Sequence, residues 1–239
     1  MRSTTAAGIG IGLAAALAFL ALPSVASAQD FRFPFLQEAE EQVEELPMKS
    51  GVLLVGRLSA ISGEIDPYIP VDYEDLFGVG IGASIEGRMM WEVEPGGWIG
   101  GYLSAGWDEF EGDRDTDDYG DSLESDGMEV TTLLAGFKCL YMFTPRVYCE
   151  GHLGVGVAHY GRVDGTLTTG GVPEDVTIFD STTTGVCDVG ARFGYARRRF
   201  VAEIGFGMRF QGSPDNADFD FDSSGPAVFS LEAAIGFQF

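Results

Sequence analysis

The residues from 113 to 124 have the types and the spacing of a calcium loop. The stretch reads DRDTDDYGDSLE, and oxygen ligands stand at its first, third, fifth, ninth and twelfth positions: Asp113, Asp115, Asp117, Asp121 and Glu124. Calcium takes about six to eight oxygen ligands, and an EF-hand supplies them at this spacing. Asp118 stands where an EF-hand has glycine, and no helical pattern flanks the stretch. Two hypotheses stay open: a bound calcium ion, the only cofactor the sequence suggests, or a solvated acidic loop.

The two histidines are the next candidates for chemistry, since histidine is the commonest general base. His152 lies two residues after Glu150, and His159 lies near the end of the same apolar-alternating segment. Neither is followed at short range by a serine or cysteine that could act as a nucleophile. Hydrogen bonding or packing is therefore the favoured role, and we predict no enzyme activity. A nucleophile on a distant strand stays open.

The N-terminus must be set aside before the fold is considered. Arg2 precedes an uncharged apolar run over 6–22, and Ala26-Ser27-Ala28 forms a small-x-small cleavage site. This order predicts a secretory signal peptide over 1–28, with an uncleaved anchor as the alternative. Residues 29–49 form an acidic segment, expected in the periplasm as a short helix or linker. The remaining residues, 50–239, form the folded domain.

Hydrophobicity alternates with a period of two from residue 50 onward. Near the C-terminus, Phe229, Leu231 and Ile235 share one face, while Ser230 and Glu232 share the other. This alternation is typical of strands. Eight segments follow the pattern: 50–63, 77–93, 97–110, 128–143, 147–163, 183–197, 199–212 and 227–239. Short and long links alternate between them, as in an up-and-down membrane barrel with turns at one end and loops at the other.

The polarity of the two faces decides between a soluble and a membrane barrel. A lipocalin-type barrel has an apolar interior, whereas an eight-stranded interior is only just wide enough for side chains. Here the apolar face carries the larger side chains, so we expect it to contact lipid. Aromatic residues predict girdles at the turn side (Trp91, Trp98, Tyr141, Phe143, Tyr195, Phe200 and Phe239) and at the loop side (Phe77, Trp107, Phe110, Phe210 and Phe229). The fold class is therefore all-β: an eight-stranded antiparallel up-and-down transmembrane β-barrel.

This architecture, together with a terminal Phe239 on an alternating strand, resembles the small outer-membrane barrels of the OmpA/OmpX type over about 50–239. The resemblance implies the outer membrane of a Gram-negative-type bacterium, with outer-membrane lipid as the surroundings. It also implies that Phe239 is read by the barrel-assembly machinery. The family includes structural proteins, adhesins, lipid-modifying enzymes and narrow channels, so the resemblance does not fix an activity.

The charges divide between the loops and the predicted lumen. The formal net charge is −23, which excludes nucleic acid as a partner because a phosphate-binding surface needs clustered Lys and Arg. Strand parity sends a nearly balanced set inward: Arg57, Glu86, Arg88, Glu92, Asp108, Lys138, Glu150, Arg162, Asp188, Arg192, Glu203, Arg209 and Glu232. These groups predict structural ion pairs or, alternatively, the lining of a narrow water path. The acidic loops would favour cations in such a pore.

Two of the three cysteines are placed for a disulfide. Cys139 and Cys149 lie at equal distance from residue 144, so a hairpin centred there sets them opposite each other on the outward face. Export to an oxidising compartment permits the bond. A hairpin shifted by two residues would separate them. Cys187 is expected to be a lone lipid-facing thiol.

Three functions stay open from the sequence. The first is a structural or surface-interaction barrel whose lumen is filled by charged side chains, with an unknown partner for its loops. The second is a narrow cation-preferring pore, and the third is a lipid-acting enzyme. Lipid A deacylases of similar barrel shape pair a histidine with a serine two residues on, which neither His152 nor His159 has.

Overall fold

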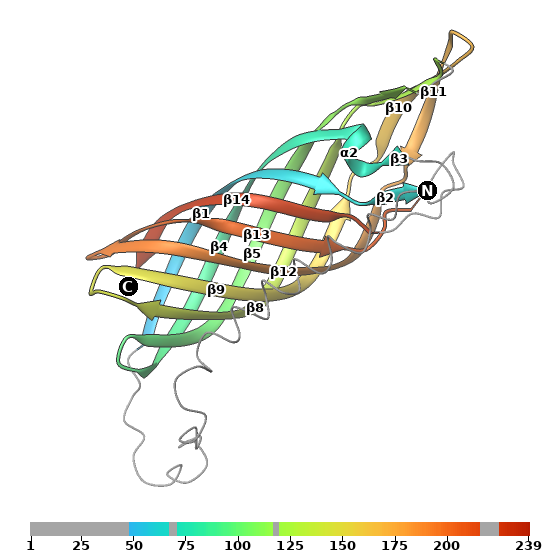
Figure 1. The fold of residues 1–239 in the computed structure, drawn as a ribbon. Helices are drawn as coiled ribbons and strands as arrows, with labels where there is room; N and C mark the ends of the chain where they lie inside the picture. The colour runs from blue at the N-terminus through green and yellow to red at the C-terminus, as the bar shows by residue number, and fades with distance from the viewer. Residues whose placement is uncertain (1–47, 67–70, 117–119, 216–224) are drawn as a thin grey trace, which may run out of the picture. The chain divides into compact units, whose positions relative to one another are not determined.

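The computed structural model describes residues 48–66, 71–116, 120–215 and 225–239. Eight long antiparallel strands close into a barrel in the order β1-β14-β13-β12-β9-β8-β5-β4 (Figure 1). The strands are β1 (Met48–Ser62), β4 (Phe77–Glu94), β5 (Gly97–Gly112), β8 (Met128–Met142), β9 (Val147–Tyr160), β12 (Thr182–Arg197), β13 (Phe200–Gln211) and β14 (Ala227–Gln238). Each is longer than the 9–11 residues or so that a tilted strand needs to cross hydrocarbon. The predicted fold class and all eight predicted segments are confirmed.

Links of two to four residues join the strands at one end of the barrel, at 95–96, 143–146 and 198–199. Gly96 has a positive φ of 83°, as a tight turn requires, and Arg198 adopts a φ of 56° that L residues with a side chain rarely take. We call this end the turn end. Much longer connections leave the opposite end, here called the loop end.

The exterior of the barrel is apolar, and the interior is polar. Outward side chains such as Phe137, Ile204 and Leu231 are 78%, 70% and 66% exposed. This is the inverse of a soluble barrel, and it matches a surface that lies in hydrocarbon. Among the described residues, no helix is long and apolar enough to span a membrane.

Most of the predicted girdle lies on the exterior, but three of its members do not. Trp98 and Phe110 are buried, because both sit at inward positions of β5. Phe77 is buried as well, since a bulge between Phe77 and Gly80 reverses the facing of β4 at its start. The expectation for these three aromatic residues was wrong.

The loop end continues past the barrel in small elements of its own. β2 (Glu64–Asp66), β3 (Val71–Asp72) and the one-turn helix α2 (Tyr73–Leu76) follow β1. A four-stranded sheet in the order β11-β10-β7-β6 extends beyond the barrel, built from β6 (Arg114–Thr116), β7 (Ser122–Ser125), β10 (Val163–Thr169) and β11 (Val172–Phe179). Figure 1 shows β10 and β11 reaching away from the barrel mouth. Below, we call this four-stranded unit the projecting sheet.

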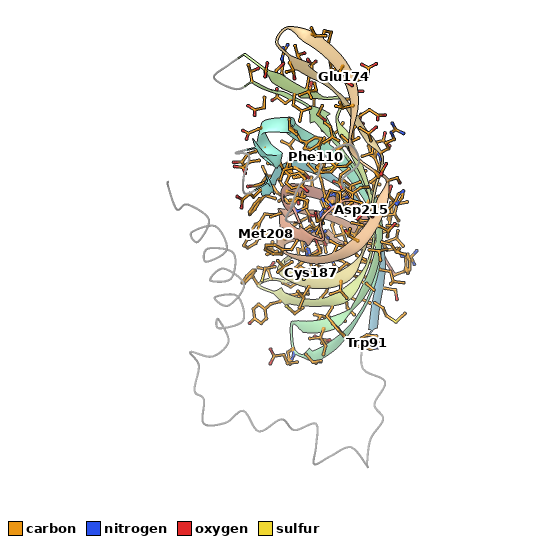
Figure 2. All side chains as sticks on the ribbon, turned by 90° about the vertical axis from the view of Figure 1, so that its right-hand side faces the viewer. Trp91, Phe110, Glu174, Cys187, Met208 and Asp215 are labelled. Carbon is orange, nitrogen blue, oxygen red and sulfur yellow. The ribbon has the colours of Figure 1, made fainter. Side chains whose placement is uncertain are left out.

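Buried apolar side chains fill the barrel beneath the projecting sheet. Tyr73, Phe77 and Phe179 stack with ring centroids 5.9–6.5 Å apart. Phe110, labelled in Figure 2, belongs to the same cluster. Tyr160 adds a polar contact, donating its hydroxyl to Gln211 Oε1 at 2.5 Å. An apolar layer therefore lies at the loop end of the lumen.

The predicted signal peptide over 1–28 and nearly all of the acidic segment over 29–49 lie outside the described residues. They stay predictions.

Candidate functional site

The interior of the barrel holds the densest group of ionisable side chains. The inward positions of six strands supply it, with Glu86 and Arg88 from β4, Lys138 from β8, Glu150 from β9, Arg192 from β12, Glu203 from β13 and Glu232 from β14. Their side chains are all at most 5% exposed. Strand parity alone brings together residues that are up to 146 positions apart, from Glu86 to Glu232. We call these seven residues the lower network.

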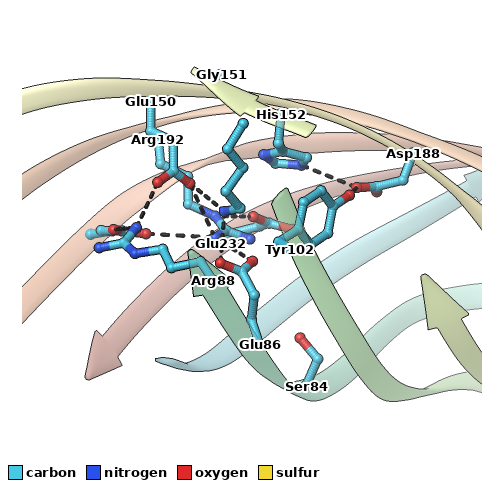
Figure 3. Close-up of polar contacts among 12 residues, drawn as sticks. Ser84, Glu86, Arg88, Tyr102, Glu150, Gly151, His152, Asp188, Arg192 and Glu232 are labelled. Atoms are coloured by element: carbon cyan, nitrogen blue, oxygen red, sulfur yellow. Dashed lines mark hydrogen bonds and ion pairs between the residues drawn. The ribbon is translucent and has the colours of Figure 1, made fainter. Parts of the chain in front are cut away.

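Three cations hold four carboxylates in the lower network (Figure 3). Arg88 donates from Nη1 to Glu150 Oε2 and to Glu203 Oε1, both at 2.6 Å. Arg192 donates from Nε to Glu232 Oε2 at 2.7 Å and from Nη1 to Glu86 Oε2 at 3.0 Å. Lys138 contacts Glu86 at 2.7 Å and Glu150 more closely still. Each carboxylate meets at least one cation, which is the condition under which buried charge is tolerated.

A second group lies nearer the loop end, and we call it the upper network. Asp108 accepts two hydrogen bonds from Arg57, at 3.0 and 3.1 Å, and one from Arg209 at 2.7 Å. Arg57 also donates to Ser84 Oγ at 2.8 Å. Asp188 lies 3.1 Å from His152 Nε2 and accepts from the Tyr102 hydroxyl at 3.2 Å (Figure 3). The two networks span the interior between opposite walls.

Two residues predicted to join the lumen charges do not. Arg162 lies past the end of β9, with its side chain 60% exposed and bonded to Asp164 at 2.8 Å. The strand ends earlier than predicted, so lumen parity no longer applies to it. Glu92 faces the turn, where its Oε1 accepts from the backbone N–H of Gly96 at 3.1 Å. It joins neither network.

The acidic candidates for calcium form a hairpin rather than a closed loop over the part that the structure describes. Arg114 pairs with Glu124 and Asp115 with Leu123 across β6 and β7. Asp113 Oδ1 accepts a hydrogen bond from the backbone N–H of Arg114 at 2.8 Å, and Asp121 Oδ1 accepts one from the N–H of Gly170 at 2.8 Å. Asp117 lies outside the described residues. Within the described ranges, no group of three or more His, Cys, Asp or Glu side chains is placed to hold a metal ion. Calcium binding stays a prediction.

At the loop end, Asp164 has a pKa that its hydrogen-bond partners change. The hydrogen bond from Arg162, helped by one from Thr177, lowers the pKa of the Asp164 carboxyl below its ordinary value. The Asp164 side chain is 50% exposed, so this ion pair belongs to the surface.

The predicted disulfide between Cys139 and Cys149 is wrong. Cys139 pairs with Gly151, and Cys149 pairs with Tyr141. The hairpin is centred on residue 145 and not on 144, which moves the two thiols to diagonal positions. Both are free, as is Cys187.

The histidines occupy opposite faces of β9. His152 points inward to Asp188, and its Nδ1 has no partner in the described part of the chain. His159 points outward, with Nδ1 3.0 Å from Thr183 Oγ1 and Nε2 3.5 Å from Ser181 Oγ. The sequence could not indicate Ser181, because only the pairing of β9 with β12 brings it to His159. Its hydroxyl also lies within hydrogen-bond distance of the Tyr160 carbonyl, to which it donates at 3.1 Å.

A closed eight-stranded barrel with a lipid-facing exterior and a charged interior defines the fold as that of a small outer-membrane-type transmembrane barrel. No protein-family model and no curated protein matches the sequence.

Solved outer-membrane barrels resemble the chain in structure. Ail, the attachment invasion locus protein of Yersinia pestis, in complex with the heparin analogue sucrose octasulfate, is 12% identical over 81% of this chain and 100% of its own, with a TM-score of 0.42. Neisserial surface protein A is 10% identical over 80% and 97%, with a TM-score of 0.41. The outer-membrane protease OmpT of Escherichia coli is 7% identical over 80% and 96%, with a TM-score of 0.45. At these values the likeness concerns the fold alone.

Proposed function

We propose that the protein is an outer-membrane β-barrel with a structural or surface-interaction role, a closed lumen and no catalysis. The filled interior is the observation that supports this proposal most. The lower and upper networks cross the lumen, and the apolar cluster around Phe110 lies above them. An eight-stranded barrel has little room beside such side chains. A continuous water path is therefore disfavoured.

The projecting sheet is the part of the proposed protein that would meet a partner. Its surface is acidic: Asp113, Glu124, Glu174 and Asp175 are exposed, and Figure 2 shows Glu174 far from the barrel. Arg114 lies only 3.8 Å from Glu124, so part of its charge is already matched. A partner of positive charge fits this surface, because complementary charge speeds encounter and excludes like-charged competitors. A sulfated ligand of the kind bound to Ail would be repelled here.

The cellular setting belongs to the same proposal. The chain is secreted after cleavage of its signal peptide and inserted into the outer membrane of a Gram-negative-type bacterium, with outer-membrane lipid around its apolar belt. The barrel-assembly machinery would read the last strand. Phe239 is well placed for that, since its side chain is 71% exposed and its backbone pairs with Ser50 at 2.9 and 3.1 Å.

Single-channel conductance of the refolded protein in a planar bilayer tests the closed lumen. We expect no steady current, or only brief small events, because ion-paired side chains cross the narrow lumen. A large and stable cation-selective current would overturn this proposal in favour of the narrow pore. The charge of the partner is tested by binding of oligolysine and oligoglutamate peptides, with Glu174→Gln plus Asp175→Asn as the variant. Tighter binding of oligoglutamate would contradict the proposed charge.

The third hypothesis, a lipid-acting enzyme, has one contact in its favour, between His159 and Ser181. Acyl-chain analysis of outer-membrane lipid from cells with and without the protein tests it. We expect no difference, and none between wild type and Ser181→Ala. A change in acyl chains that Ser181→Ala abolishes would establish catalysis at this pair.

A further inference from the structure

A small cavity opens at the turn end of the barrel, below the lower network. Its volume is about 90 Å³, and its lining includes Lys49, Arg88, Trp98, Met142, Tyr148 and Arg198. A water molecule occupies roughly 30 Å³ in the liquid, so the cavity has room for about three waters or one small polyatomic ion. Drug-sized ligands need pockets of about 300 Å³ or more. The size restricts any ligand to a small ion or to one head group.

Lys49 places a positive charge without a direct ion pair, among the described residues, in this cavity. Its Nζ lies 4.0 Å from the centroid of the Trp98 ring and 3.9 Å from Met142 Sδ. No carboxylate of the described ranges lies within ion-pair distance of it. Glu92, the nearby acid, accepts at Oε1 from the Gly96 backbone N–H and acts on Lys49 only from beyond ion-pair distance. A half-buried ammonium that contacts a ring and a thioether keeps its full charge, so it can still attract an anion.

Trp98 belongs to the same lining, and its indole N–H is a buried donor that a tilt of the ring would turn toward the cavity. The residue is 6% exposed, and its indole Nε1–H has no acceptor among the described residues. Buried donors are nearly always satisfied by protein, water or an ion. A donor-only group beside an ammonium is suited to an oxygen of an anion and unsuited to a cation.

Arg198 is the third observation, and it is independent of the other two. It adopts its φ of 56° in the two-residue link between β12 and β13, where glycine would avoid the steric cost. Its carbonyl accepts from Gln238 Nε2 at 3.2 Å, which fixes the backbone while the guanidinium carries no ion pair in the described structure. A guanidinium without a described ion pair therefore lines the cavity at a position where the turn favours glycine.

From these three observations we propose that the turn-end cavity binds a small oxyanion of the phosphate class. Lys49 Nζ and the Arg198 guanidinium supply the charge, and Trp98 Nε1–H donates to an oxygen. Arg88 lies at the floor but is committed to Glu150 and Glu203. The phosphate can come from solution or from the head group of an anionic phospholipid in the leaflet around the turns, and both present the same chemistry.

Isothermal titration of the refolded full chain with inorganic phosphate, in zwitterionic nanodiscs, tests the proposal. We expect one site per barrel, with chloride at equal ionic strength giving no competition. Lys49→Gln should weaken binding at least tenfold, and Trp98→Phe several-fold, because phenylalanine keeps the ring and removes only the donor. Arg198→Gly should weaken binding while raising resistance to urea, since glycine relieves the strained φ. That opposite pair of effects separates a binding role from a structural one.

Arg114→Gln, at the loop end, is the matched control and should leave phosphate binding unchanged. If it weakens binding as much as Lys49→Gln does, or if several phosphates bind per barrel, general screening is responsible and the site is refuted. Absence of phosphate binding to the wild type also refutes it. Nanodiscs with phosphatidylglycerol separate the two sources: weaker apparent phosphate affinity there supports a lipid head group as occupant, and unchanged affinity supports free phosphate.

Discussion

Replacement of Arg88 by alanine should cost more stability than any change at the barrel surface. Arg88 is the cation shared by Glu150 and Glu203, at 2.6 Å from each. Its removal leaves Glu203 with the Tyr148 hydroxyl and with Arg192 at 3.5 Å. Breaking a buried ion pair from one side costs about 3–5 kcal/mol. Because the remaining cations compensate in part, we expect the free energy of unfolding to fall by about 3 kcal/mol.

Urea unfolding in lipid vesicles, followed by tryptophan fluorescence, measures this loss. With a slope of about 1–3 kcal/mol per molar urea, the midpoint should fall by about 1–3 M. Arg162→Ala is the matched control: it also removes an arginine that contacts a carboxylate, but that pair is exposed, so its cost should stay within about 1 kcal/mol. The loss of Arg88 would also make the lumen more negative by one charge, so Arg88→Ala should admit a small cation-selective current that the wild type lacks.

A second substitution shows whether the cost comes from uncompensated charge. In the Arg88→Ala background, Glu203→Gln removes the carboxylate that has lost its closest cation. We expect it to restore about 1–2 kcal/mol, within the usual range of coupling between contacting residues. If Arg88→Ala costs no more than Arg162→Ala, or if the two lumen changes are simply additive, our account of the lower network is wrong.

Three further predictions follow from the described contacts. Alkylation under non-reducing conditions should find all three thiols free, and a disulfide would contradict the register of β8 and β9. The Asp164 carboxyl should titrate below its usual pKa of 3.8. The small stabilisation from its ion pair is present above that pH and is lost as the pH falls through the lowered pKa. Arg162→Gln should raise the NMR titration midpoint of Asp164, and an unchanged midpoint would exclude Arg162 as the cause. Millimolar calcium should stabilise the protein no more than magnesium does, through screening, whereas an increment specific to calcium that Asp113→Ala with Glu124→Ala removes would establish chelation.

Much of this barrel can be predicted from the sequence, because alternate residues of each strand face lipid and the lumen and differ in polarity accordingly. Lipid requires an apolar side chain at every second position, and the narrow lumen accepts small or paired polar ones. Phe229, Leu231 and Ile235 face outward for the first reason, and Glu232 reaches Arg192 for the second. In a regular strand, whether a residue number is odd or even therefore predicts whether its side chain faces lipid or the lumen.

The errors arise where parity is interrupted or does not apply. The bulge at the start of β4 turns Phe77 inward, and the early end of β9 frees Arg162 from the lumen. Registers between strands depend on turn conformation, so a shift of one residue in the turn centre was enough to separate Cys139 from Cys149. The contact of His159 with Ser181 and the cavity at Lys49 likewise depend on which strands are neighbours.

Some of the 34 glycines among the 239 residues make room for side chains in the lumen, and this yields a last prediction. A Cβ at Gly194, on β12, would lie 2.1 Å from the ring of Tyr148, whose hydroxyl bonds Glu203 at 2.5 Å. Gly194→Ala should therefore displace Tyr148 and cost about 1–3 kcal/mol by overpacking. Gly87→Ala is the matched control, since a Cβ at this outward position of β4 meets no atom within 4 Å and should be neutral or slightly stabilising. Urea unfolding of both variants decides the point. Equal losses of stability would contradict a specific role for Gly194. A larger loss at Gly194 than at Gly87 would show that Gly194 makes room for the lumen side chain of Tyr148.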